Sequence, residues 1–379
     1  MVHHRCTYRL GRTKYVLAVG PMVLVALATS TSADVFIQTN LVSDVPGLAA
    51  NTDANLKNPW GVSFSATSPF WVSNQVTGNS TLYNGSGTPL ALVVTVPQST
   101  TPPAGPTGQV FNPSATDFRL VNGNKANFIF SNLDGSISGW NAGTAAELKV
   151  TSTVPTVYTG LAIGNNGTGN FLYAADARGG KVDVINGLWA RTTLAGSFTD
   201  PNLPSGFVPY NVQTIGNTLY VTYENRSLGG GVVNAFDLNG NFLRRIAANA
   251  SGGVLDDPWG VVVAPLSFGQ FGGDLLIGNK KNGRISAFDI STPVPTFAGQ
   301  LLDANNVPIA NTGLWGIAFG TGAQGFATNT LYFAAGINNE TNGLFGSIRA
   351  VPEPTSLLLM GTGVVLIRTL IRRLRAFSA

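Results

Sequence analysis

The residues best suited to chemistry are acidic and amide side chains that follow six short apolar runs. They are Asn74, Asp134, Asp176, Glu224, Asn279 and Asn338. Oxygen-bearing groups of this kind suit a hard cation such as Ca²⁺, and together with aromatic side chains they suit sugar rings. Each also has a structural interpretation, because Asn and Asp side chains bond their own backbone in turns. Any shared chemistry depends on a fold that brings these positions together.

A second recurring signature joins an aromatic residue to a glycine. It reads Asn58-Pro59-Trp60-Gly61-Val62, returns as Asp257-Pro258-Trp259-Gly260-Val261, and appears more loosely as Gly313-Leu314-Trp315-Gly316-Ile317. Weaker copies are Val208-Pro209-Tyr210-Asn211-Val212 and Gly160-Leu161-Ala162-Ile163. An apolar run with its polar residue follows each copy, and a glycine-containing turn and a further strand come next.

These signatures predict how the chain is built. They fit six units of about 53 residues each between residues 34 and 350, and four-stranded units of roughly this length are typical of propeller blades. We therefore predict an all-β fold, a six-bladed β-propeller. The leading strand at residues 36–40 should complete the last blade and so remove a free sheet edge. Glycine should lie at the crowded axis, and the tryptophans should cover the seams between blades.

A propeller would bring both signatures to one face, as a rim rich in carbonyls, carboxylates and aromatic rings. The predicted ligand-binding rim consists of Asn58, Trp60, Asn74, Asp134, Asp176, Asn211, Glu224, Asp257, Trp259, Asn279, Trp315 and Asn338. Lys280 and Lys281 occupy one of its turns, where they either contact an acidic glycan or form a solvated hairpin tip.

Composition excludes several kinds of site. The only cysteine, Cys6, and the only histidines, His3 and His4, precede the predicted start of the mature chain, which removes thiolate nucleophiles, zinc sites and histidine bases. Eight of the 22 basic residues and one of the 18 acidic residues lie in the two ends, which leaves 14 basic and 17 acidic residues in the body. A mildly acidic body gives no electrostatic basis for binding nucleic acid.

The first 33 residues have the three parts of a secretory signal peptide. A basic start precedes the apolar run Val16–Ala28 and a polar stretch that ends at Ala33, where signal peptidase is expected to cut. The alternative, an uncleaved membrane anchor, needs about 20 apolar residues, and this run is shorter. The predicted parts of the chain are thus a signal peptide at 1–33, a propeller at 34–350 and a C-terminal segment at 351–379.

The C-terminal segment carries the most specific motif. Val351-Pro352-Glu353-Pro354 precedes an apolar run at 357–367 and a basic end that includes Arg372 and Arg373. Physically this is a proline hinge, a short hydrophobic stretch and a cationic stop on the cytoplasmic side. In detail it resembles the PEP-CTERM sorting signal of Gram-negative bacteria. That resemblance implies recognition by an exosortase, a transmembrane sorting tail before processing, and transfer to the cell surface or matrix. An ordinary tail anchor is the alternative.

The body has its own resemblances. Phe171-Leu172-Tyr173-Ala174-Ala175-Asp176 resembles the strands of NHL-type six-bladed propellers. Gln38-Thr39-Asn40-Leu41-Val42-Ser43-Asp44 and Thr81-Leu82-Tyr83-Asn84-Gly85 are similar to a family of uncharacterised exported bacterial proteins. That family carries no known activity or catalytic residues to transfer.

Two functions follow as hypotheses. The first is a non-catalytic binding module of the cell envelope or extracellular matrix, with an exopolysaccharide or surface protein as partner. The alternative is a Ca²⁺-dependent lactonase- or esterase-like hydrolase, because some six-bladed propellers hold a catalytic metal with Glu, Asn and Asp at the axis. Its metal ligands here would be Glu224, Asn211 and Asp257. Many such enzymes also use histidine, so its absence from the body is a departure from that pattern.

Overall fold

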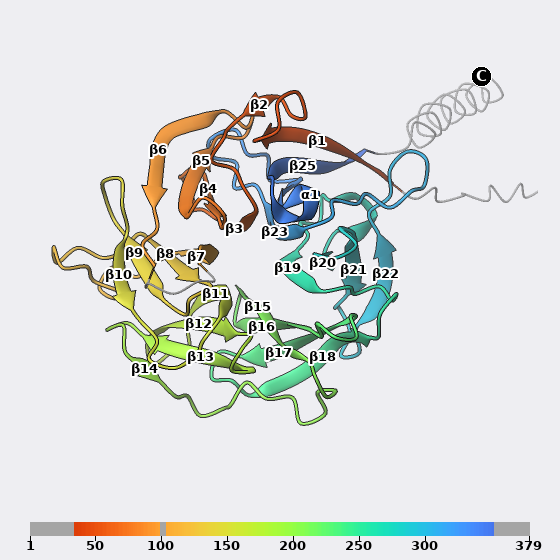
Figure 1. The fold of residues 1–379 in the computed structure, drawn as a ribbon. Coiled ribbons are helices and arrows are strands. Elements are labelled where there is room, and N and C mark those ends of the chain that lie inside the picture. Colours follow the sequence, from red (N-terminus) through yellow and green to blue (C-terminus); the bar gives the residue numbers. More distant parts are fainter. Residues whose placement is uncertain (1–33, 99–103, 352–379) are drawn as a thin grey trace, which may run out of the picture. The chain divides into compact units, whose positions relative to one another are not determined.

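Six sheets of mainly antiparallel strands surround a central axis in the computed structural model (Figure 1). The structure describes residues 34–98 and 104–351. The predicted cleavage site at Ala33 and the motif residues Pro352, Glu353 and Pro354 lie outside the described residues. In the described ranges there is no helix long and apolar enough to cross a membrane.

Five of the blades use four strands that are consecutive in the chain. Blade 1 contains β3 (Pro59–Ser63), β4 (Phe70–Asn74), β5 (Asn79–Tyr83) and β6 (Pro89–Thr95). Blade 2 contains β7 (Pro106–Phe111), β8 (Phe128–Asn132), β9 (Ile137–Trp140) and β10 (Glu147–Val150). Blade 3 contains β11 (Tyr158–Asn165), β12 (Asn170–Asp176), β13 (Lys181–Asn186) and β14 (Arg191–Thr192). Blade 4 contains β15 (Val208–Ile215), β16 (Thr218–Glu224), β17 (Gly231–Asp237) and β18 (Phe242–Asn249). Blade 5 contains β19 (Pro258–Val263), β20 (Leu275–Asn279), β21 (Ile285–Asp289) and β22 (Thr296–Gln300), with a 3₁₀ turn at Gly269–Phe271.

Blade 6 joins the two ends of the described chain. It contains β23 (Leu314–Phe319), β24 (Thr330–Ala335), β25 (Leu344–Val351) and β1 (Val35–Ser43), with β2 (Asn51–Thr52) beside β1 and the short α1 (Ile337–Glu340) before β25. Strand β1 runs antiparallel to β25, with Phe36 opposite Ala350. The predicted closure and the count of six blades are therefore confirmed, and the ring is complete within residues 34–351.

Glycine permits the innermost strands to touch around the axis. A Cβ atom added at Gly61 would lie 2.5 Å from the carbonyl oxygen of Thr107 in the next blade, and one added at Gly316 would lie 2.6 Å from that of Trp60. Real Cβ atoms do not approach a backbone oxygen so closely, so these positions admit only glycine without a shift of the strands. Blade 2 has the same arrangement at Thr107-Gly108, a copy of the signature that lacks the aromatic residue and that sequence reasoning missed.

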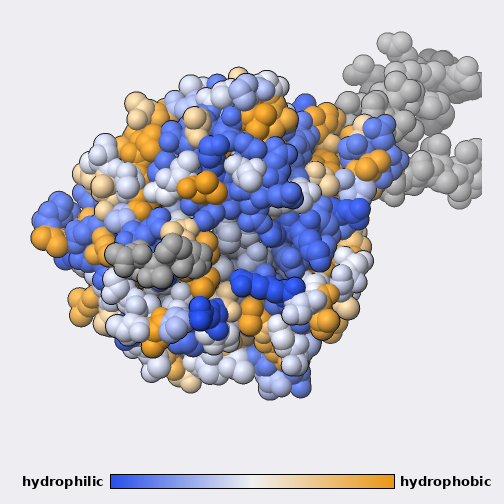
Figure 2. Space-filling view, in the orientation of Figure 1, coloured by the Kyte–Doolittle hydropathy of each residue, from blue (hydrophilic) through white to orange (hydrophobic). Residues whose placement is uncertain are grey.

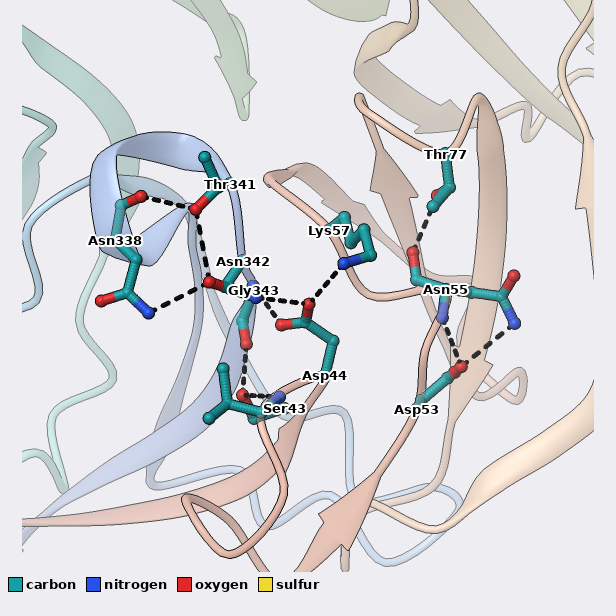
Figure 3. A network of polar contacts seen from close by, with 11 residues as sticks. Ser43, Asp44, Asp53, Asn55, Lys57, Thr77, Asn338, Thr341, Asn342 and Gly343 are labelled. Atoms are coloured by element: carbon teal, nitrogen blue, oxygen red, sulfur yellow. Dashed lines mark hydrogen bonds and ion pairs between the residues drawn. The ribbon is translucent and has the colours of Figure 1, made fainter.

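A buried carboxylate secures the closure (Figure 3). Asp44, directly after β1, accepts hydrogen bonds from Lys57 Nζ at 3.0 Å, Asn342 Nδ2 at 2.7 Å and the Gly343 N–H at 2.8 Å. Next to it, the Ser43 hydroxyl donates to the Gly343 carbonyl oxygen at 2.7 Å. Asp44 thus ties β1 to the loop before β25 and to the loop that enters blade 1. Charge-assisted hydrogen bonds of this kind are stronger than neutral ones.

We predict that Asp44→Ala lowers the free energy of unfolding by about 3 kcal/mol, because it leaves three partly buried donors without their shared acceptor. Denaturant unfolding of the protein comprising residues 34–351 measures this change. Asp289→Ala is the matched control, since Asp289 accepts a hydrogen bond from the N–H of Ser291 in its own turn. Equal losses in the two variants would contradict the role of Asp44 in closure.

Candidate functional site

Four aromatic rings meet at the axis and form what we call the axial aromatic cluster. Its members are Trp60, Tyr210, Trp259 and Trp315, from blades 1, 4, 5 and 6. Trp60 stacks on Trp315 with 3.6 Å between ring centroids, and Trp259 meets both rings edge-on at 6.2 and 5.9 Å. The three tryptophans are at most 5% exposed. The predicted position over the seams between neighbouring blades stays a prediction, and the structure adds that the three rings pack on one another.

Hydrogen bonds fix two of the three indole rings. Trp259 Nε1 donates to the Thr159 carbonyl oxygen at 2.9 Å, and Trp315 Nε1 donates to Asn58 Oδ1 at 3.0 Å. Trp60 Nε1 is buried and has no partner among the described residues. Hydrogen bonds therefore hold two of the three rings, and the third indole donor is enclosed without a partner among the described residues.

A group of charged residues, the axial charged cluster, lies next to these rings. It consists of Glu224, Arg226, Asp257, Lys280 and Glu340. Arg226 Nε lies 2.6 Å from Glu224 Oε1, and Lys280 Nζ lies 2.6 Å from Glu340 Oε1 and 5.5 Å from the centre of the Trp315 ring. These residues occupy loops and strand ends on the face where the innermost strands begin, which we call the amino-end face. Figure 2 shows hydrophilic residues around the centre of this face, onto which α1 projects in Figure 1.

The backbone of α1 positions the last member of this cluster. Asn338, Asn339 and Glu340 all have positive φ, at 53°, 54° and 65°. A run of left-handed residues without glycine costs free energy, and such strain persists mainly where the surroundings fix it, often at functional sites. Here the turn brings Glu340 to Lys280 of the neighbouring blade, and Glu340 Oε2 also lies 3.5 Å from Asn58 Nδ2.

The carboxyl groups of the charged cluster influence one another. Burial raises the pKa of Glu224, and the negative charge of Asp257 acts in the same direction, against Arg226. Burial likewise raises the pKa of Asp257. One oxygen of Asp257, Oδ1, is buried with no hydrogen-bond partner among the described residues. Burial also raises the pKa of the Tyr210 hydroxyl. The carboxylates that add to this shift are Glu224, Glu340 and Asp257.

The structure places most of the predicted rim inside the protein. The buried members are Asn58, Trp60, Asn74, Asp176, Asn211, Glu224, Trp259, Asn279 and Trp315. Asp134 and Asp257 are partly buried, and Asn338 is exposed. Several of the polar side chains hold turns: Asp176 Oδ1 accepts from the Val157 and Gly179 N–H groups, and Asn279 Oδ1 accepts from the Asp256 N–H. Glu224, Asp257 and Asn58 belong to the axial site, and ligand binding by the whole rim stays a prediction.

Asn211 has a structural partner. It occupies the position that is glycine in the other five blades, and its Nδ2 donates to the Trp259 carbonyl oxygen at 2.8 Å. A hydrogen bond thus replaces the close backbone contact in blade 4. In the described part of the chain no three acidic, histidine or cysteine side chains are grouped to hold a metal. The set Glu224, Asn211 and Asp257 stays a predicted metal site.

Sequence reasoning missed three residues of this site. Tyr210 had a signal, because its segment aligns with the tryptophan signature. Arg226 and Glu340 had none, since each lies in a loop whose conformation brings it to the axis. Lys280, which was predicted to be either a glycan contact or a solvated tip, is paired with Glu340, and contact with a glycan stays a prediction.

The fold and this axial site define a six-bladed β-propeller, and comparisons with known proteins extend that description. The chain belongs to the family of the "Uncharacterized protein R648" of Acanthamoeba polyphaga mimivirus, with 30% identity over 332 residues, which cover 81% of this chain and 78% of that protein. The "Uncharacterized protein L690" of the same virus is 29% identical over 332 residues, which cover 81% of this chain and 84% of that protein.

The C-terminal segment and the fold have matches of their own. Residues 350–375 match the PEP-CTERM protein-sorting motif, which confirms the predicted signal and indicates export and sorting in a Gram-negative bacterium, with processing by an exosortase. A structural genomics protein of unknown function from Bacteroides thetaiotaomicron VPI-5482 superposes with a TM-score of 0.54 at 12% identity, over 84% of this chain and 76% of that one. The soluble aldose sugar dehydrogenase from Escherichia coli superposes with a TM-score of 0.50 at 14% identity, over 84% of this chain and 100% of that one. At such identities the likeness concerns the fold.

The raised pKa of Glu224 predicts a pH dependence of stability. The folded state binds this proton more tightly than the unfolded chain, so the contribution is present at low pH and is lost as the pH rises through the folded-state pKa, above the ordinary value of 4.5. We therefore expect the melting temperature of Glu224→Gln minus that of the parent protein to become more positive as the pH rises from about 4 to about 8.

Glu147→Gln is the control for this titration. Although burial acts to raise it, the pKa of Glu147 is lowered by hydrogen bonds from Lys149 and the Val121 N–H. Its contribution therefore appears as the pH rises, and Glu147→Gln should lose melting temperature relative to the parent over the same range. Shifts of the same sign in both variants would contradict the assignment for Glu224.

Proposed function

We propose that this protein is an exported binding module that holds neutral sugar chains of the cell surface or extracellular matrix on its amino-end face. In this proposal signal peptidase cuts after Ala33, and the C-terminal segment anchors the chain in the membrane until exosortase processes it. The axial charged cluster and the donors beside it bind the ligand.

The observation that carries the proposal is that the charges of the axial charged cluster pair with one another beside the axial aromatic cluster. Arg226 pairs with Glu224, and Lys280 pairs with Glu340. Since each cation already has a carboxylate, the surface gains little from a polyanion, whereas paired ions still donate to and accept from hydroxyl groups. Sugar hydroxyls can donate to the carboxylates and accept from the cations of this cluster at once.

The aromatic rings contribute rigidity in this proposal. Trp315 is 1% exposed, so a sugar ring cannot stack on it while Lys280 and Glu340 are in place. Recognition therefore relies on hydrogen bonds held in a fixed geometry, which limits the conformational entropy lost on binding.

Calorimetric titration of the protein comprising residues 34–351 with neutral and uronate oligosaccharides tests the proposal. We expect neutral chains to bind, and Glu340→Gln and Asp257→Asn each to weaken binding about tenfold, because each replaces one acceptor oxygen with a donor and removes a negative charge. Asp289→Asn, in a distant turn, is the control. Preference for uronates, or unchanged affinity in both variants, would contradict the proposal.

A metal-dependent hydrolase is the second candidate, and the coupling of the buried Glu224 and Asp257 carboxyl groups favours it. A cation bound between them would stabilise the folded state by mass action. Thermal melts with Ca²⁺ and with a chelator separate the two functions. The binding module predicts equal melting temperatures. A Ca²⁺-dependent rise that Asp257→Asn abolishes would instead support the hydrolase, and lactones and esters would then be the substrates to test.

A further inference from the structure

A cavity lies on the axis, on the side where the innermost strands end. It has a volume of about 390 Å³ and is lined by residues of β3, β7, β11, β15, β19 and β23 or directly after them. The axial aromatic cluster occupies the other ends of the same strands, so it closes this axial cavity at its inner end. Between the two is a space of about 20 Å³, lined by Gly61, Gly108, Gly260 and Gly316 among others. That space has room for about one water molecule.

Most of the residues that line the cavity have apolar side chains, and every blade contributes at least one of them. Each blade contributes at least one partly exposed apolar side chain to the lining, among them Val62, Val110, Ile163, Ile215, Val262 and Phe319. Together they form a ring of apolar surface that water wets in the free protein. Covering such surface is favourable, at about 25 cal/mol per Å². The site therefore favours a ligand with an apolar body.

The polar groups of the axial cavity are few and uncharged. They are Ser63, Gln109, Gln213 and Thr214. Gln109 is already satisfied, since its Nε2 donates to Ser63 Oγ at 2.7 Å and its Oε1 accepts from Ser73 Oγ at 2.7 Å and Ser80 Oγ at 2.9 Å. The Thr214 hydroxyl, in contrast, is buried without a partner among the described residues. Gln213 is exposed and lines both this cavity and the small space beyond it.

We propose that the axial cavity binds a small neutral molecule with an apolar body and one hydroxyl or carbonyl end that bonds Thr214. The volume lies within the range of small-molecule sites, and the closed inner end accepts a compact ligand and not a chain that passes through. The uncharged lining offers no counter-ion, so an ionised ligand would lose its hydration without compensation. This site is independent of the amino-end face and of the sugar-binding function proposed for it.

Fluorescence titration with 1-N-phenylnaphthylamine, a neutral apolar probe, tests the site in the protein comprising residues 34–351. We expect saturable binding with one site per molecule, displaced by octan-1-ol at concentrations at least tenfold lower than by octanoate. The two competitors share one chain length and differ in the charge of the head group. Absence of saturable binding, or equal competition by octanoate, would overturn the proposal.

Two variants locate the site. Val262→Glu adds a charge to the apolar ring and should weaken probe binding about tenfold. Val294→Glu makes the same change at a residue that is 74% exposed and does not line the cavity, and it should leave binding unchanged. Equal binding by both variants would place the probe elsewhere and overturn the assignment. Melting temperatures confirm that both variants fold.

Thr214→Val tests the polar end of the ligand. The change keeps the shape of the side chain and removes a buried hydroxyl without a partner, so the melting temperature should stay level or rise. Competition by octan-1-ol should weaken severalfold in this variant, because its hydroxyl loses the bond to Thr214. Unchanged competition would overturn the role of Thr214.

Discussion

The structure depends on the close approach of six innermost strands around one axis. Five blades meet this constraint with glycine, and a side chain at those positions would overlap the backbone of the next blade, as at Gly61 and Gly316. Blade 4 meets it differently, because Asn211 spans the gap with a hydrogen bond to the Trp259 carbonyl oxygen. The ring can then close through β1 and β25, where Asp44 joins three separate segments.

This constraint also separates the two axial sites. The residue before the glycine of blades 1, 5 and 6 is a tryptophan, and its ring reaches the axis because the strands are so near. The packed rings divide the axis into a charged amino-end face and an apolar cavity at the strands' carboxyl ends. The same close packing thus supports two binding proposals of opposite chemistry, one for hydroxyl-rich chains and one for a small apolar molecule. The sorting motif indicates that the protein is exported and sorted.

Much of the fold could be predicted, because the repeated signatures report backbone constraints that every blade shares. Glycine at the axis, closure by the leading strand and the C-terminal motif all follow from such local patterns. The site was harder to predict. Glu340 reaches the axis through three left-handed residues in a row. Asparagine adopts that conformation more readily than most residues, but usually as a single residue, so the order Asn-Asn-Glu does not predict the run. The blade 2 copy of the signature was missed because it has Thr107 where other copies have an aromatic residue. The axial cavity could not be predicted either, because it is formed by six separate strands whose alignment is fixed only in the closed ring.

The most direct test of this account is the stability of Gly316→Ala, measured by denaturant unfolding beside Gly169→Ala. A Cβ atom at residue 169 would make ordinary contacts, 3.5 Å from the Phe171 ring, whereas one at residue 316 would lie 2.6 Å from the Trp60 carbonyl oxygen. The account predicts a loss of about 3 kcal/mol for Gly316→Ala and little change for Gly169→Ala. Similar stability of the two variants would contradict the claim that close axial packing organises the ring and its two sites.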